Sequence, residues 1–125
     1  MAIQDNPKHA YLKNYLSHIE FVKEKTVDSL VNQYQKHVGT YGPREFWIED
    51  NKFYYKRRNE TTELPKYELL PIDGNRYMDI TRTGTIMAFE NDDNGNEVSR
   101  SYSYYTDSFE WKPSVTGENY FLKEN

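Results

Sequence analysis

The spacing of apolar residues changes once along this chain. Apolar side chains recur at every third or fourth position up to residue 34, and at every second position from about residue 38. The helical spacing is carried first by Leu12, Tyr15, Leu16, Ile19 and Val22, and then by Val27, Leu30, Val31 and Tyr34. Two amphipathic N-terminal helices are therefore predicted. Their apolar stripes need a surface to cover them, either the sheet that follows or a neighbour outside this chain.

Residues that start and stop helices mark the boundaries of this pair. Asn6 can cap the first helix, and Pro7 suits its first position because proline has no N–H to satisfy there. Thr26 offers a cap for the second helix, and Gly39 is a stop signal after it.

The period of two predicts short strands from residue 38 onward. Turn-forming residues separate them at Gly42-Pro43, Asp50-Asn51, Asp73-Gly74-Asn75 and 92–95. The expected strands lie near 38–41, 44–49, 52–58, 66–72, 76–80, 84–91 and 97–105, with another near 108–112. Strands at this spacing favour an antiparallel meander of seven or eight strands that forms a lipocalin-like barrel or a strongly curved sheet. The predicted fold class is therefore α+β.

The hairpin over residues 44–57 is the strongest local prediction. If Asp50 and Asn51 form its two-residue loop, both faces become consistent. The facing pairs on one side are Glu49 with Lys52, Trp47 with Tyr54, and Glu45 with Lys56. The facing pairs on the other side are Ile48 with Phe53 and Phe46 with Tyr55. The second side is apolar and is expected to face the interior, because a shift of one residue would mix the two faces.

The chain divides into three parts. Residues 1–37 form a helical segment that packs on the sheet or on a missing upstream domain. Residues 38–112 form the β domain, and residues 113–125 form a polar C-terminal tail in which 120–122 could add an edge strand.

The composition indicates that aromatic side chains make up much of the core. The 125 residues include 16% aromatic residues, among them 12 tyrosines, and such rings bury large areas. The net charge is −4, which disfavours nucleic acid as a partner.

The basic run 56–58 is interpreted as a solvated strand end, with anion contact as the less favoured alternative. There is no cysteine, and no apolar run approaches the ~20 residues that span a bilayer.

Motifs for metal binding are weak. His9 and His18 lie on opposite sides of one helix, and His37 follows another, so no metal site is predicted. The acidic stretch 90–97 fails the calcium-loop pattern, because Ser101 stands where a bidentate Glu is needed. It is interpreted as a hairpin turn, and a weak surface cation is the alternative.

Motifs for catalysis are weak as well. Asp73 with Asp79, or Glu45 with Glu49, could serve acid/base work, but Glu45 and Glu49 face lysines in the hairpin. No Gly-x-Ser-x-Gly or Ser-x-x-Lys motif occurs. No catalytic residue and no cofactor are predicted.

The order of several short motifs carries a family resemblance. The motifs run from Leu30 and Tyr34 through 39–42 to the hairpin at 46–55, and continue with Leu69-Leu70-Pro71, Tyr77, Ile86, Phe89, Asp92, Gly95 and Val98. This order resembles the lipocalin-like β domain appended behind serine hydrolases of the β-lactamase and esterase type, behind tetratricopeptide-repeat proteins and behind carboxyl-terminal-type proteases. The resemblance implies a lipocalin-like fold. It implies no hydrolase activity, because the catalytic residues of those enzymes are absent.

The leading functional hypothesis is a non-catalytic accessory or interaction domain. Its partner would be another protein, its own hydrolase or repeat domain, or a second copy, and Trp47 with Tyr54 is the predicted contact patch. The alternative is a module that binds a small hydrophobic ligand in its interior, and the predicted lining residues are Phe46, Phe53, Tyr55, Tyr67 and Tyr77. A stand-alone enzyme ranks last. The compartment is extracytoplasmic if the chain was cut from a hydrolase, and cytoplasmic otherwise.

Overall fold

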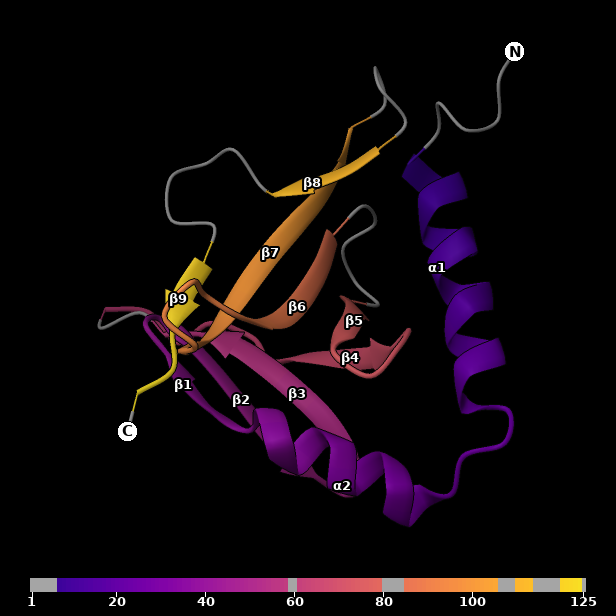
Figure 1. Cartoon of the computed structure of the whole chain (residues 1–125), viewed down its shortest axis with the longest axis horizontal. Helices are drawn as coiled ribbons and strands as arrows, with labels where there is room; N and C mark the ends of the chain where they lie inside the picture. The colour runs from indigo at the N-terminus through magenta and orange to yellow at the C-terminus, as the bar shows by residue number, and fades with distance from the viewer. Residues whose placement is uncertain (1–6, 59–60, 80–84, 106–109, 114–119, 125) are drawn as a thin grey trace.

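A computed structural model describes residues 7–58, 61–79, 85–105, 110–113 and 120–124, and for 7–11, 104–105 and 110–113 the backbone alone. Two helices precede a nine-stranded antiparallel sheet that curls into a nearly closed barrel (Figure 1). The helices are α1 (Pro7–Val22) and α2 (Val27–His37). The strands are β1 (Gly39–Tyr41), β2 (Arg44–Glu49), β3 (Lys52–Arg57), β4 (Tyr67–Pro71), β5 (Arg76–Asp79), β6 (Thr85–Asn91), β7 (Glu97–Tyr105), β8 (Glu110–Pro113) and β9 (Tyr120–Leu122). The predicted α+β fold class is confirmed.

The β2–β3 hairpin forms in the predicted register. Asp50 and Asn51 take positive φ values of 53° and 63°, the conformation that a tight two-residue hairpin turn requires. Phe46 pairs with Tyr55 and Ile48 pairs with Phe53 on the inner face. Local turn chemistry therefore fixed the register of the first hairpin, and with it the inward direction of its rings.

Helix α2 packs on the inner face of the sheet, across β1, β2 and β3 (Figure 1). Its start is fixed by Thr26, whose hydroxyl oxygen accepts a hydrogen bond from the Ser29 backbone N–H at 3.0 Å. Tyr34 stacks on Phe53 with ring centroids 5.2 Å apart. Gln33 Nε2 donates to the Tyr77 hydroxyl at 2.9 Å. Helix α2 therefore covers the open side of the barrel.

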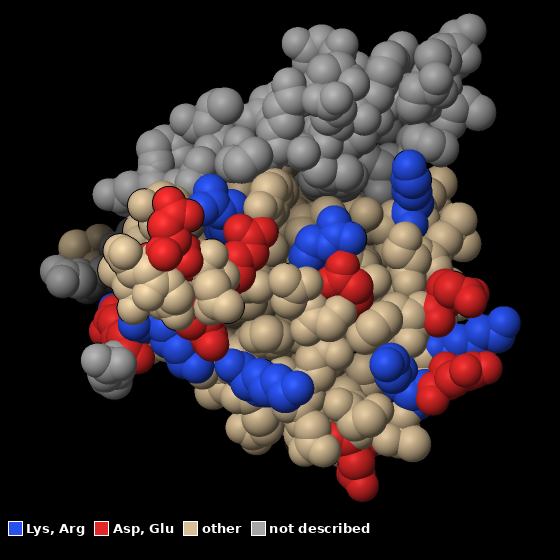
Figure 2. Space-filling model, viewed as in Figure 1, with Lys and Arg blue, Asp and Glu red and all other residues tan. Residues whose placement is uncertain are grey.

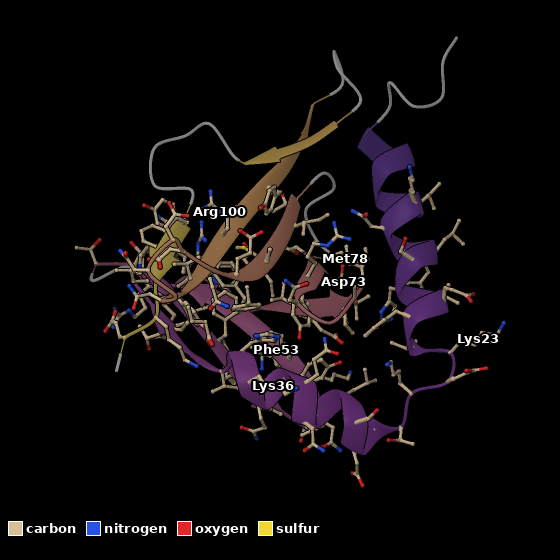
Figure 3. The ribbon with its side chains drawn as sticks, in the orientation of Figure 1. Lys23, Lys36, Phe53, Asp73, Met78 and Arg100 are labelled. Carbon is tan, nitrogen blue, oxygen red and sulfur yellow. The ribbon has the colours of Figure 1, made fainter. Side chains whose placement is uncertain are left out.

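The core between α2 and the strands is mostly aromatic, and Figure 3 shows Phe53 in this layer. Its buried residues are Tyr34, Tyr41, Phe46, Phe53, Tyr55, Leu69, Tyr77, Met87 and Phe89. Each strand from β1 to β6 contributes a ring or an apolar side chain, so the sheet must curve to bring them together.

The C-terminal segment closes the gap between β1 and β7. Strand β9 pairs with β7, and the Lys123 backbone N–H donates to the Glu97 carbonyl at 2.9 Å. The Glu124 backbone N–H donates to the Thr40 carbonyl of β1 at 2.7 Å. The predicted edge strand at 120–122 therefore forms and joins β7 to β1. Of the expected polar tail, 114–119 and 125 lie outside the described residues.

A ring from β9 fits over the β1–β2 turn. Gly42 has a φ of 58°, and a Cβ atom at this position would lie 2.5 Å from Phe121 Cδ1. The Arg44 guanidinium lies 4.7 Å from the Phe121 ring centre and donates to the Ser99 carbonyl at 3.0 Å. The absence of a side chain at Gly42 therefore makes room for the closing strand.

We expect Gly42→Ala to lower the free energy of unfolding by about 2–4 kcal/mol, because it combines backbone strain with a clash against Phe121. The measurement is equilibrium unfolding in urea. Gly95→Ala is the matched control, because Gly95 also has a positive φ, 81°, but nothing lies within 4 Å of its Cβ position. Equal losses in the two variants would show that Phe121 is not seated on this turn.

Candidate interaction surface

Helix α1 is fixed to the barrel by its polar side. Asn14 is buried, and the His18 Nδ1 atom is hydrogen-bonded to the Pro71 carbonyl of β4 at 2.8 Å. Phe21 and Val22 are half-buried near the end of the helix. These four residues lie on one side of the helix, since they are spaced three or four positions apart. The side of α1 that carries most of its apolar residues is therefore turned elsewhere.

The apolar stripe of α1 is exposed. The exposed fractions are 56% for Leu12, 41% for Tyr15, 65% for Leu16 and 46% for Ile19. We call these four residues the α1 stripe. The sequence left two surfaces open for the predicted stripe, the sheet or a neighbour outside this chain. The sheet leaves these four residues exposed. Val22, the fifth residue of the predicted stripe, is half-buried.

Charged side chains border the stripe on one side. Lys13 and Glu20 are exposed and lie two helical turns apart, so they are on the same flank of α1. On the other flank the Tyr15 ring stacks on His18, with centroids 6.1 Å apart, next to the barrel. The stripe is thus bounded by the barrel on one side and by charges of both signs on the other.

The predicted contact patch, Trp47 with Tyr54, is a half-buried ring pair on the outer face of β2 and β3. The rings stack with centroids 5.9 Å apart. Lys66 Nζ lies 4.7 Å from the Tyr54 ring centre and 2.6 Å from a Glu49 carboxylate oxygen. The Trp47 indole N–H donates to the other Glu49 oxygen at 3.3 Å. Neighbouring side chains therefore hold these rings against the hairpin.

The predicted facing pairs of this hairpin are confirmed, but the carboxylates of Glu45 and Glu49 form ion pairs with other residues. Glu49 pairs with Lys66 rather than Lys52, and Glu45 lies 3.6 Å from Arg58 rather than pairing with Lys56. Long side chains on an exposed face reach diagonal and neighbouring strands, so register alone does not determine which charges meet.

The residues predicted to line a ligand cavity are placed in the core. Phe46, Phe53, Tyr55 and Tyr77 are at most 3% exposed, and Tyr67 is half-buried. Phe53 lies 4.9 Å from Tyr77 and 5.9 Å from Phe46 between ring centroids, and Tyr55 stacks on Tyr67 at 6.3 Å. At these distances the rings pack directly against one another. These five residues therefore belong to, or pack against, the aromatic core.

The basic run at residues 56–58 lines an open surface hollow with acidic neighbours. Lys56 pairs with Glu63 at 3.2 Å, and Arg58 pairs with Glu45 and Glu124 at 3.6 Å. On the face seen in Figure 2, Lys and Arg alternate with Asp and Glu. The charges at this strand end are therefore matched, as expected for a solvated surface.

The acidic stretch at 90–97 forms the predicted hairpin turn. One Asp92 carboxylate oxygen accepts hydrogen bonds from the backbone N–H groups of Asn94 and Asn96, both at 2.9 Å, and Gly95 has a φ of 81°. These bonds, that from Asn96 first, lower the pKa of Asp92. Within the described part of the chain, no three His, Asp or Glu side chains are grouped as a metal site.

A polar cluster that sequence reasoning did not find lies where α2 meets β1 and β7. The Tyr41 hydroxyl donates to Glu97 at 2.7 Å, and Lys123 lies 3.0 Å from the same carboxylate oxygen. His37 is buried against Phe89, with ring centroids 4.4 Å apart. Its Nε2 lies 3.2 Å from the Gly74 carbonyl, whereas Nδ1 is buried without a hydrogen-bond partner among the described residues. No sequence signal pointed here, because these residues come from four separate elements.

Comparison with protein-family models, with curated proteins and with solved structures found no match. The resemblance to the lipocalin-like appended domain stays a prediction. Neither helix, within the described ranges, has the length and apolar character needed to cross a membrane. The surface geometry is therefore the basis for assigning a function.

His37 should make the protein less stable in mild acid. Burial lowers the pKa of His37 below 6.5, against the opposing effects of the Gly74 carbonyl and the Glu97 charge. The unfolded chain then takes up a proton that the folded ring does not, so stability is lost as the pH falls below about 6.5. The measurement is the free energy of unfolding between pH 7.5 and 5.5, in the wild type and in His37→Phe, which keeps a ring against Phe89. The variant should show a smaller slope, and identical slopes would contradict a neutral buried imidazole.

Proposed function

We propose that this protein is a non-catalytic interaction domain that binds a protein partner through the α1 stripe. The observation that carries this proposal is the exposure of Leu12, Leu16 and Ile19 on a helix held to the barrel by a different side. Exposed apolar residues gathered on one face are typical of contact sites in soluble proteins.

The barrel supports this role as a scaffold. Its interior holds packed rings, and α2 and β9 secure two of its sides. A rigid support lowers the entropy lost on binding, because the contact residues are already arranged before the partner arrives. The α1 stripe can therefore be presented without rearrangement of the core.

The family resemblance agrees with an accessory role and extends the proposal to possible partners. Domains of the resembled type follow a hydrolase or a repeat domain in the same chain, so such a domain is one class of partner for the stripe. The motifs behind the resemblance supply core residues such as Tyr34, Tyr41 and Phe53. No catalytic activity is part of the proposal.

Photo-crosslinking tests this proposal at the residue level. Leu16 is replaced with p-benzoylphenylalanine, the protein is irradiated in its native cells, and crosslinked proteins are identified by mass spectrometry. We expect a discrete protein adduct, either with another protein or with the chain itself, because Leu16 is 65% exposed at the centre of the stripe.

The control places the same photoreactive residue at Asn94, an exposed position in the β6–β7 turn. An adduct at residue 16 that is absent at residue 94 supports a contact site on α1. No adduct at residue 16, or the same adducts at both positions, contradicts the proposal.

A further inference from the structure

We propose that the α1 stripe binds a second copy of this chain, so that two α1 helices pack antiparallel about a twofold axis near Leu16. This inference rests on the proposed function, since it assigns a partner to the same surface. It is argued from the symmetry of the stripe and from the charges beside it.

The apolar positions are self-complementary. Leu12, Leu16 and Ile19 recur at intervals of four and three, which is the spacing of a seam between two helices. In an antiparallel pair centred near Leu16, that residue meets its own copy, and Leu12 meets Ile19 of the second copy. A twofold interface requires such reciprocal contacts.

The charges beside the stripe favour this orientation. Lys13 and Glu20 lie on one flank, on either side of Leu16 along the helix. Antiparallel packing brings this flank against the same flank of the second copy. Lys13 of each chain then lies beside Glu20 of the other, which gives two opposite-charge pairs.

A parallel pair fits less well. It would set the charged flank of each helix against the barrel-side flank of the other, so Lys13 and Glu20 would not meet across the interface.

A lipid surface fits the stripe less well than a second copy does. Helices that lie on membranes carry mainly Lys and Arg on the polar face. The exposed charged residues beside the stripe and just after it are Lys13, Glu20, Lys23, Glu24 and Lys25, so both signs are present. Figure 3 shows Lys23 at the far end of α1.

The contact area predicts a reversible dimer. Four exposed side chains on one helix offer less surface than the roughly 800 Å² per partner of a standard stable interface. We therefore expect a dissociation constant on the order of 10–100 µM.

Sedimentation velocity of the purified chain between about 2 and 500 µM tests the dimer, over a range that brackets the expected constant. We expect a shift from monomer to dimer in the wild type and a monomer at every concentration in Leu16→Glu. Val27→Glu is the matched control, since Val27 is 58% exposed at the start of α2 and lies outside the stripe. This control should dimerise like the wild type. Circular dichroism checks that each variant is folded.

Charge reversal tests the orientation. Lys13→Glu and Glu20→Lys should each weaken the dimer several-fold, because each places like charges side by side across the interface. The double variant should restore wild-type affinity. Lack of rescue in the double variant would overturn the antiparallel arrangement.

Three results would each overturn self-association by α1. The first is a wild-type protein that stays monomeric up to about 500 µM, and the second is a dimer that survives Leu16→Glu. The third is binding of the monomer to anionic lipid vesicles through Leu16. If the chain is monomeric but position 16 crosslinks a different protein in cells, self-association fails and the interaction function stands. If position 16 crosslinks nothing and the chain is monomeric, both fail.

Discussion

Contact between aromatic rings from α2 and from the strands is the interaction on which the rest of this structure depends. Phe53 lies 4.9 to 6.0 Å, between ring centroids, from Tyr34, Tyr77, Phe46 and Phe89. These rings come from α2, β2, β3, β5 and β6, so satisfying their contacts fixes the curvature of the sheet and seats α2 against it. Helix α1 lies outside this core, where His18 meets β4 and the α1 stripe stays exposed.

Most residues of the motifs behind the family resemblance have a structural role in this fold. Tyr34, Tyr41, Tyr77 and Phe89 are all buried, and Gly95 with Asp92 forms a turn. These positions serve folding, so the motifs behind the resemblance describe the core and a turn of this fold. The exposed stripe of α1 precedes the first of those motifs.

Sequence patterns predicted the elements well because their signals are local. Asp50-Asn51 fixed one hairpin, Thr26 capped α2, and the period of two gave the inward rings. Contacts between distant segments could not be predicted in the same way. The spacing of apolar residues on α1 defines a stripe but does not say what covers it, and nothing near Gly42 in the sequence indicates that Phe121 packs over it. The clustering of His37, Tyr41, Glu97 and Lys123 likewise follows from closure of the barrel by the C-terminal segment.

The most direct test of this account compares the loss of a core ring with the loss of a stripe residue in dilute, monomeric protein. Phe53 has no exposed surface, whereas Leu16 is 65% exposed. Chemical unfolding should show that Phe53→Ala lowers the free energy of unfolding by about 3–5 kcal/mol and that Leu16→Ala lowers it by at most about 0.5 kcal/mol. A loss in Leu16→Ala as large as that in Phe53→Ala would contradict the account, because the stripe would then be part of the folded core.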